Sequence, residues 1–261
     1  MDRQLSSDRV AESRICLVTG ASRGIGASVA VTLSRDGHRV ALLGRDGPAL
    51  DAVGAGLPSD VLSVPADVTD PVAVEGAFAA VEGRWGSVEV LVCNAGAGFA
   101  APLADTTDED WARMLELNLT APFRLMRRAV PAMVERGWGR IVVVASVVAK
   151  RGEPQVAAYS AAKHGVLGLV RSAAAELART GVTVNAVCPG YVDTPMTDAT
   201  VAAMGTRSGR GPDESRAALA RRQPIGRLIE PGEVAEAVRF CLVNAAVTGQ
   251  GINVDGGAVQ S

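Results

Sequence analysis

The sequence predicts an α/β fold: a single Rossmann-type, doubly wound domain with a parallel sheet of about seven strands and helices on both faces. Three observations support this fold class. Strand-like and helix-like segments alternate along almost the whole chain. The strand-like segments are continuous Val, Ile and Leu runs, which is typical of strands buried on both faces. A glycine-rich turn separates the first strand from the first helix.

The order of elements follows from apolar runs and helical periodicity. Strands are expected at 15–19, 39–43, 61–64, 88–93, 140–145, 182–188 and 251–254. Helices are expected at 24–36, 47–56, 71–84, 108–135, 157–179 and 231–243. In the longest stretch, Thr107 or Asp108 can cap the N-terminus, and Pro122 and Pro131 should kink or interrupt the helix. The polar, glycine-containing stretch 191–223 is the least predictable part.

Composition limits the classes of function. The chain has 261 residues, 48% of them hydrophobic, so one domain spanning 1–261 can bury a large core. Lysine and arginine total 26 against 28 acidic residues, which gives no electrostatic reason to expect nucleic acid or a membrane as partner. The sequence has no apolar run of membrane-spanning length and no signal-peptide core, so a cytoplasmic location is expected. Cys16, Cys93, Cys188 and Cys241 form no cluster with the two histidines, so we expect buried thiols and no metal site.

The turn after the first strand reads Thr19-Gly20-Ala21-Ser22-Arg23-Gly24-Ile25-Gly26. Glycines allow the backbone to turn tightly and to approach a pyrophosphate closely. The N–H groups and the dipole of the following helix favour the phosphate charge. A purely structural turn is the alternative, but the order of strand, turn and helix favours a dinucleotide site.

A second group of residues suggests proton chemistry. Tyr159 and Lys163 are four residues apart in a predicted helix, so their side chains share one face, and a nearby ammonium lowers the pKa of a phenol. Ser146 ends the fifth strand, at the edge of the sheet where such folds place ligands, and its hydroxyl could bind a carbonyl oxygen. Taken alone, these residues could also be a solvated helix face and a turn cap. Asn118, inside the long helix, could mark a local distortion.

Together these motifs resemble the short-chain dehydrogenase/reductase family over about residues 13–257. The turn has that family's T-G-x-x-x-G-x-G spacing, Asn94-Ala95-Gly96 follows the fourth strand, and Pro189-Gly190 follows the sixth. The resemblance implies hydride transfer between a nicotinamide and a carbonyl or alcohol carbon. It assigns proton transfer to Tyr159, stabilisation of the oxygen to Ser146, contact with the cofactor ribose to Lys163, and a water-mediated proton relay to Asn118.

The end of the second strand bears on the choice between NADPH and NADH. Gly44 stands where an NAD-preferring relative would carry Asp, and Arg45 and Arg23 could pair with a 2′-phosphate, so NADPH is expected. Asp46 is the competing observation, because a carboxylate there could accept a hydrogen bond from the ribose. We favour Asp46 as a helix cap.

Further cofactor contacts follow from the resemblance alone. Asp67-Val68 matches an adenine contact, although a turn or a helix cap would explain Asp67 nearly as well, and Thr194 matches a contact to the nicotinamide amide. The complete expected cofactor-binding set is Gly20, Ser22, Arg23, Gly24, Ile25, Gly26, Arg45, Asp67, Val68, Asn94, Ala95, Gly96, Tyr159, Lys163, Pro189, Gly190, Val192 and Thr194.

The stretch 191–223 is expected to form a mobile, basic lid over the substrate. The chain is most similar to β-ketoacyl and polyketide ketoreductases, which implies reduction of a ketone on a thioester carried by acyl carrier protein or coenzyme A. It departs from the polyketide enzymes in VVAKRGEPQ after Ser146 and in Cys93. The alternatives are an NAD-dependent alcohol or 3-hydroxyacyl dehydrogenase and a nucleotide-sensing regulator. The family also implies a homotetramer paired through 108–135 and 157–179.

Overall fold

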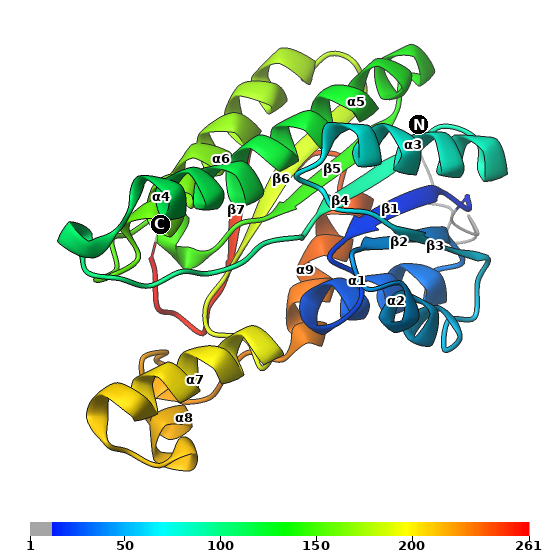
Figure 1. Ribbon diagram of the computed structural model, residues 1–261. Helices are drawn as coiled ribbons and strands as arrows, with labels where there is room; N and C mark the ends of the chain where they lie inside the picture. Colours follow the sequence, from blue (N-terminus) through cyan, green and yellow to red (C-terminus); the bar gives the residue numbers. More distant parts are fainter. Residues whose placement is uncertain (1–11, 261) are drawn as a thin grey trace, which may run out of the picture.

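The computed structural model describes residues 12–260, and its centre is a parallel seven-stranded sheet (Figure 1). The strand order is β3-β2-β1-β4-β5-β6-β7, so the winding direction reverses between β1 and β4. The predicted fold class is therefore confirmed. The strands are β1 (Ile15–Thr19), β2 (Arg39–Gly44), β3 (Val61–Pro65), β4 (Val90–Cys93), β5 (Gly139–Val144), β6 (Val182–Pro189) and β7 (Gly251–Val254).

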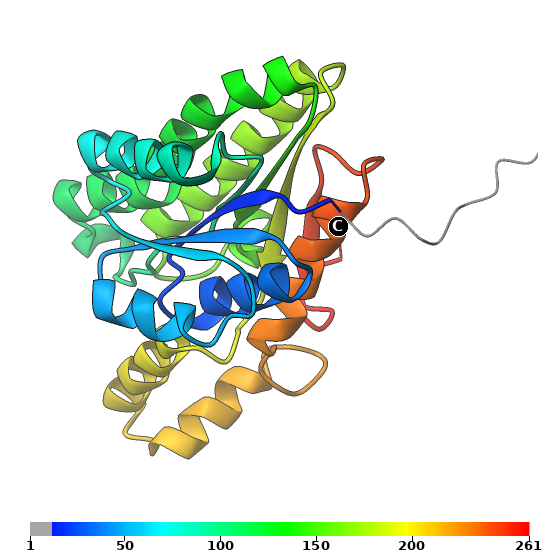
Figure 2. The ribbon, with the colours of Figure 1, turned by 90° about the vertical axis from the view of Figure 1, so that its right-hand side faces the viewer.

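Helices cover both faces of the sheet, as Figures 1 and 2 show. One face packs against α1 (Gly24–Arg35), α2 (Gly47–Gly54) and α9 (Pro231–Val243); the other packs against α3 (Pro71–Trp85), α5 (Ala121–Arg136) and α6 (Ala157–Leu177). Successive strand residues supply the two cores in turn, so Leu17 belongs to one and Val18 to the other, and both are fully buried. This double burial is the physical reason for the continuous apolar runs.

Side-chain caps fix where several helices begin. Asp46 caps α2 by accepting a hydrogen bond from the Ala49 N–H at 3.1 Å, as expected for this residue. Asp70 caps α3, and Thr107 caps α4 (Asp108–Leu115) by accepting from the Asp110 N–H at 3.1 Å. The carboxylates of Asp46 and Asp70 therefore accept hydrogen bonds from backbone N–H groups close to them in the chain.

The expected helix 108–135 is not continuous. Between α4 and α5 lies a π-helical turn, η2 (Glu116–Thr120), in which the Ala121 N–H reaches the Glu116 carbonyl. Pro122 has no N–H to donate to the Asn118 carbonyl, which explains why the regular helix is interrupted here. Pro131, which was expected to kink or interrupt the helix, does not interrupt it, because α5 continues through it to Arg136; a kink at Pro131 stays a prediction.

The stretch 191–223 forms a projecting helical pair beyond the carboxyl ends of the strands, namely α7 (Pro195–Ser208) and α8 (Pro212–Ala220) (Figure 1). Val201 and Leu219 are buried where the pair packs. Two short 3-10 helices, η1 (Leu103–Asp105) and η3 (Val147–Ala149), complete the described elements. None of the helices within 12–260 combines the length and apolar character needed to cross a bilayer.

Two glycines provide a matched test of the backbone. Gly181, in the turn before β6, has a φ of +82°, and a Cβ there would lie 2.0 Å from the Gly137 carbonyl oxygen, whereas a Cβ on Gly168 in α6 would meet nothing within 4 Å. We expect Gly181→Ala to lower the free energy of unfolding by about 2 kcal/mol or more. Gly168→Ala should raise it by up to about 1 kcal/mol, because alanine favours a helix. Urea unfolding measures both, and equal effects would contradict this backbone geometry.

Candidate active site

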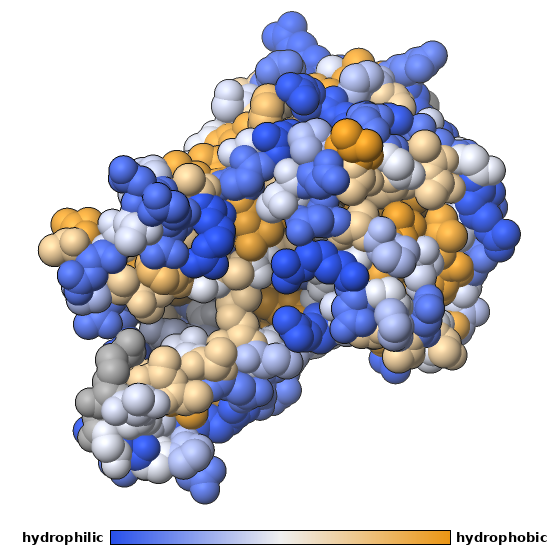
Figure 3. All heavy atoms as spheres, in the orientation of Figure 1, coloured by the Kyte–Doolittle hydropathy of each residue, from blue (hydrophilic) through white to orange (hydrophobic). Residues whose placement is uncertain are grey.

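Two adjoining cavities lie at the carboxyl edge of the sheet. The first, of about 760 Å³, is called the glycine-loop cavity, because Gly20 and residues 22–25 form part of its wall. The second, of about 680 Å³, is called the hydroxyl cavity, because Ser146 and Tyr159 line it. Gly98, Met196 and Ala199 line both, so the cavities share a wall. Figure 3 shows the molecule hollowed between the α7–α8 pair and the body.

The glycine loop is held against the end of β4. A Cβ on Gly26 would lie 2.2 Å from the Gly20 carbonyl oxygen and 2.5 Å from Asn94 Nδ2, so only glycine fits there. Asn94 Nδ2 donates to the carbonyls of Thr19 at 2.8 Å and Gly20 at 3.2 Å. The Thr19 hydroxyl in turn accepts from the N–H groups of Asn94 and Ala95, both at 2.9 Å. The two loops thus form one rigid wall.

The N-terminus of α1 presents free donors to the glycine-loop cavity. Its N-cap residue, Arg23, makes no side-chain capping bond, and the first turn holds no acidic residue. The helix dipole and its unpaired N–H groups therefore favour an anion. Thr194, at the start of α7, lies over the same loop, since a Cβ on Gly24 would lie 3.2 Å from Thr194 Cγ2. This donor set and cavity size fit the pyrophosphate of a dinucleotide.

A guanidinium stands at the end of β2. The Arg45 side chain is 81% exposed and its Nη1 lies 4.0 Å from Asp67 Oδ2. Asp67 accepts from the Thr69 N–H and hydroxyl at 2.9 and 2.7 Å, and these bonds hold the pKa of its carboxyl below the usual value. Asp67 therefore forms a turn, as one interpretation of it expects, and it also lines the cavity, where its contact with the adenine stays a prediction. A Cβ on Gly44 would meet Leu50 at 3.4 Å, an ordinary contact, so a Cβ would fit there.

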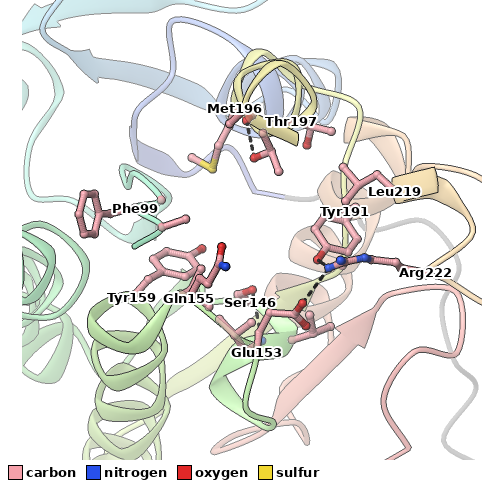
Figure 4. Close-up of a pocket in the computed structure, with 18 of the residues that line it drawn as sticks. Phe99, Ser146, Glu153, Gln155, Tyr159, Tyr191, Met196, Thr197, Leu219 and Arg222 are labelled. Atoms are coloured by element: carbon pink, nitrogen blue, oxygen red, sulfur yellow. Dashed lines mark hydrogen bonds and ion pairs between the residues drawn. The ribbon is translucent and has the colours of Figure 1, made fainter. Parts of the chain in front are cut away.

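Four polar side chains gather at the wall of the hydroxyl cavity and directly behind it. Ser146 and Tyr159 reach the hydroxyl cavity, as Figure 4 shows, while Lys163 and Asn118 are almost fully buried behind it. Lys163 Nζ donates to the Val144 carbonyl at 2.9 Å and lies 5.6 Å from the centre of the Tyr159 ring. The sequence motifs are therefore brought to one place.

Asn118 offers an unused acceptor at this place. Its Nδ2 donates to the carbonyls of Met114 and Ala97, both at 3.1 Å, whereas its Oδ1 is buried and has no partner among the described residues. A Cβ on Gly96 would lie 2.9 Å from that Oδ1 and 3.8 Å from Lys163 Nζ. The amide oxygen and the ammonium therefore converge on the space beside Gly96, which is suited to a small hydrogen-bonding group such as water.

The protonation of the site differs from the expectation. Burial raises the pKa of Tyr159 to about 12, and a hydrogen bond with Ser146 only partly opposes this. Lys163 does not lower the pKa of the phenol, because its ammonium is turned to the Val144 carbonyl and burial lowers its own pKa to about 8. In the protein without cofactor, Tyr159 is therefore a neutral hydrogen-bond donor at neutral pH.

The remaining predicted residues divide into two groups. Gly190 lines the hydroxyl cavity, but Pro189 and Val192 lie behind the walls: Pro189 pairs with Val254, and Val192 is 5% exposed and bridges to Ile229. The predicted residues that line the glycine-loop cavity are Gly20, Ser22, Arg23, Gly24, Ile25, Arg45, Asp67, Val68, Asn94, Ala95, Gly96 and Thr194.

Two residues that hold the site together were not predicted from the sequence. Thr19 is the first residue of the glycine motif, but the motif does not indicate that its hydroxyl joins the two loops. Gln223 is 1% exposed; its Oε1 accepts from the Tyr191 N–H at 2.8 Å and its Nε2 donates to the Tyr191 carbonyl at 3.1 Å. Nothing in the local sequence distinguishes Gln223 from an ordinary surface glutamine. It fixes Tyr191 in the wall of the hydroxyl cavity.

Known proteins resemble the chain over almost its whole length. Residues 20–259 match the family model described as enoyl-(acyl carrier protein) reductase. The 3-oxoacyl-[acyl-carrier-protein] reductase MabA of Mycobacterium tuberculosis is 40% identical, over 94% of this chain and 92% of that protein. The D-beta-hydroxybutyrate dehydrogenase of Rhizobium meliloti is 35% identical, over 94% and 98%.

A solved structure agrees with this result. A single-residue variant of the actinorhodin polyketide ketoreductase, solved with NADPH, superposes with a TM-score of 0.89 and 41% identity, covering 95% of this chain and 97% of that one. The family model and the identities together confirm the resemblance first drawn from the motifs. The chain belongs to the short-chain dehydrogenase/reductase family.

Proposed function

We propose that this protein is an NADPH-dependent ketoreductase that reduces a β-ketoacyl or polyketide thioester to the secondary alcohol. The observation that carries the proposal is the placement of two hydroxyl groups, those of Ser146 and Tyr159, on a cavity that adjoins the glycine-loop cavity. A carbonyl held by these hydroxyls would lie beside a cofactor held by the loop. The ketoreductase relatives support the same reaction.

The residues of the glycine-loop cavity would hold the cofactor. The N–H groups at the start of α1 would bind its pyrophosphate, Arg45 its 2′-phosphate, and Lys163 its nicotinamide ribose. Thr194 would contact the nicotinamide amide from the start of α7. When bound, the reduced nicotinamide supplies a hydride to the carbonyl carbon.

The protein's own groups would handle the proton. Tyr159 donates its proton to the substrate oxygen, which suits a phenol whose raised pKa keeps it neutral. Ser146 donates a hydrogen bond to the same oxygen and stabilises the charge that develops there. A water at Asn118 Oδ1 would connect Lys163 to solvent and return the proton.

The observations weigh against the alternatives. An NAD-dependent dehydrogenase acting in the oxidative direction is supported by the Rhizobium relative, but Asp46, its candidate ribose acceptor, is engaged as a helix cap. A nucleotide-sensing regulator would not need Ser146, Tyr159 and Lys163 together. The proposal includes acyl carrier protein or coenzyme A as carrier, a single domain with α7 and α8 as its lid, a cytoplasmic location and a homotetramer.

Tyr159 and Tyr191 are the two tyrosines of the chain, and both line the hydroxyl cavity, so they form a matched pair of variants. Tyr159→Phe should reduce kcat on a neutral β-ketoester by roughly 100-fold or more, because the proton donor is lost. Tyr191→Phe should keep kcat within about threefold of the wild type, since this hydroxyl has no part in proton transfer. NADPH oxidation measures both, and unchanged turnover in Tyr159→Phe would refute the proposed mechanism.

The buried Lys163 should make the free energy of unfolding depend on pH. Its pKa is lowered from 10.5 to about 8, so between these values the unfolded chain binds more protons than the folded one and stability rises with pH. The variant Lys163→Met has no such group. The free energy of unfolding of Lys163→Met minus that of the wild type should therefore fall by about 2 to 3 kcal/mol between about pH 7 and pH 10. Denaturant titrations without cofactor measure this, and a pH-independent difference would contradict the burial argument.

Arg45 should set the choice of cofactor. Arg45→Gln should raise the KM for NADPH by about tenfold and leave the KM for NADH nearly unchanged, because one charge-assisted contact to the 2′-phosphate is lost at an exposed site. Arg35→Gln, an exposed residue at the end of α1, serves as the control. Steady-state kinetics with both cofactors measure the effect. Parallel changes for NADPH and NADH would show that Arg45 does not contact the phosphate.

A further inference from the structure

The hydroxyl cavity has a charged wall that the proposed chemistry does not use. Arg222 Nη1 donates to Glu153 Oε1 at 2.8 Å and to the Tyr191 hydroxyl at 3.2 Å. Arg151 Nη2 donates to the other Glu153 oxygen at 3.4 Å. Figure 4 places Arg222, Tyr191 and Glu153 away from Tyr159. One carboxylate is thus shared by two guanidiniums.

The charges of this wall do not balance. Arg151, Arg222 and Glu153 all line the cavity, and among its described lining residues Glu153 is the sole carboxylate. The cluster therefore carries a net charge of about +1, which attracts an anion. Its arginine side chains are partly exposed, 31% for Arg151 and 49% for Arg222, so solvent and salt screen part of this attraction.

The cluster also keeps hydrogen-bonding capacity in reserve. The Tyr191 hydroxyl accepts from Arg222, so its own proton is free to donate. Arg151 Nε is buried and has no partner among the described residues. A guanidinium has five N–H groups, and Glu153, with both oxygens engaged, satisfies only a few of those present. These donors exceed what the fold itself requires.

Neighbouring structure holds the cluster at a defined place relative to the hydroxyls. Arg151 and Glu153 lie in the segment that joins Ser146 to Tyr159, and Arg151 Nη1 also donates to the Ala258 carbonyl at 3.3 Å. Gln223 holds the Tyr191 backbone, and Arg222 lies two residues beyond the end of α8. A substrate whose carbonyl lies at Ser146 would therefore meet these side chains along one cavity wall.

We propose that Arg151, Arg222 and Tyr191 bind an anionic oxygen group of the substrate, a carboxylate or a phosphate, and that Glu153 sets how strongly they do so. The proposal rests on the proposed reductase function and names the substrate class of the same site. A carboxylate would belong to a keto acid, and a phosphate to the phosphopantetheine arm of a carried thioester. Both accept hydrogen bonds from guanidinium and phenol groups.

The test compares ligand pairs that differ by one anionic group. Binding of acetoacetate and ethyl acetoacetate, and of 4′-phosphopantetheine and pantetheine, is measured by calorimetry on the full chain with NADP⁺ present. Turnover is measured with the same two acetoacetates and with the acetoacetyl thioesters of phosphopantetheine and pantetheine. The variants are Arg151→Gln, Arg222→Gln and Glu153→Gln, with Arg221→Gln, an exposed neighbour outside the cavity lining, as control.

Arg151→Gln and Arg222→Gln should each weaken binding and raise the KM of the anionic member by about tenfold, with changes under about twofold for its neutral counterpart. Glu153→Gln should act in the opposite direction and strengthen binding of the anionic member, because it removes the competing carboxylate. Added salt should weaken binding of the anionic members alone. The pair that responds, acetoacetates or pantetheines, identifies the carboxylate or the phosphate as the group bound.

Two results would overturn the proposal. Equal effects on charged and neutral ligands, or weaker anion binding in Glu153→Gln, would show that the cluster only holds the cavity wall together. If the anionic ligands bind selectively but no ketone is reduced, the reductase function falls while the anion site stands. If all four ketones are reduced without preference for the charged ones, the anion site falls while the reductase function stands.

Discussion

The site depends on the hydrogen bonds that join the end of β1 to the end of β4. Adjacent parallel strands whose connections leave in opposite directions open a crevice between their loops, and unsupported loops would close it or drift. Here the fully buried Thr19 hydroxyl and the Asn94 side chain bind each other's backbone. The crevice is therefore part of the folded sheet, and the start of α1 faces a cavity whose wall at the ends of β1 and β4 is held in place.

The same rigidity explains why polar side chains can be buried beside the crevice although their burial costs free energy. Lys163 is 4% exposed and its ammonium has one backbone acceptor, so burial disfavours its charge. Burial also raises the pKa of Tyr159. Burial therefore moves the two pKa values apart, to about 12 for the phenol and about 8 for the ammonium, so Tyr159 holds its proton and direct transfer from the phenol to Lys163 is unfavourable. The burial that destabilises the free protein thus keeps Tyr159 protonated as a donor.

How far the sequence predicts this structure depends on the range over which each feature is encoded. The strands, the glycine loop and the spacing of Tyr159 and Lys163 are local patterns, so they could be read from consecutive residues. The π-turn at Asn118 could not be predicted in this way. Pro122 indicates that the regular helix breaks near this point, but the form of the break depends on packing. The predicted lowering of the Tyr159 pKa was wrong in direction. The sequence shows that a lysine is near, but it does not show that the ammonium points to the Val144 carbonyl.

The charged wall illustrates the same limit at longer range. Glu153 and Arg222 are separated by 69 positions and meet only because α8 folds back over the segment after β5. In the sequence, an arginine in a basic stretch is equally well explained by a solvated helix face. Its place in a cavity wall gives Arg222 a different meaning, because its half-exposed side chain pairs there with Glu153 and the fold brings together charges that no local pattern connects.

The helix α7 links the two cavities physically. Its start lies over the glycine loop at Thr194, and Met196 and Ala199, within its first two turns, line both cavities. Because a helix is stiff along its axis, a displacement of its start would also displace the wall facing Ser146 and Tyr159. The two cavities therefore share α7 as a wall, and the shape of the hydroxyl cavity depends on the position that α7 takes over the glycine loop.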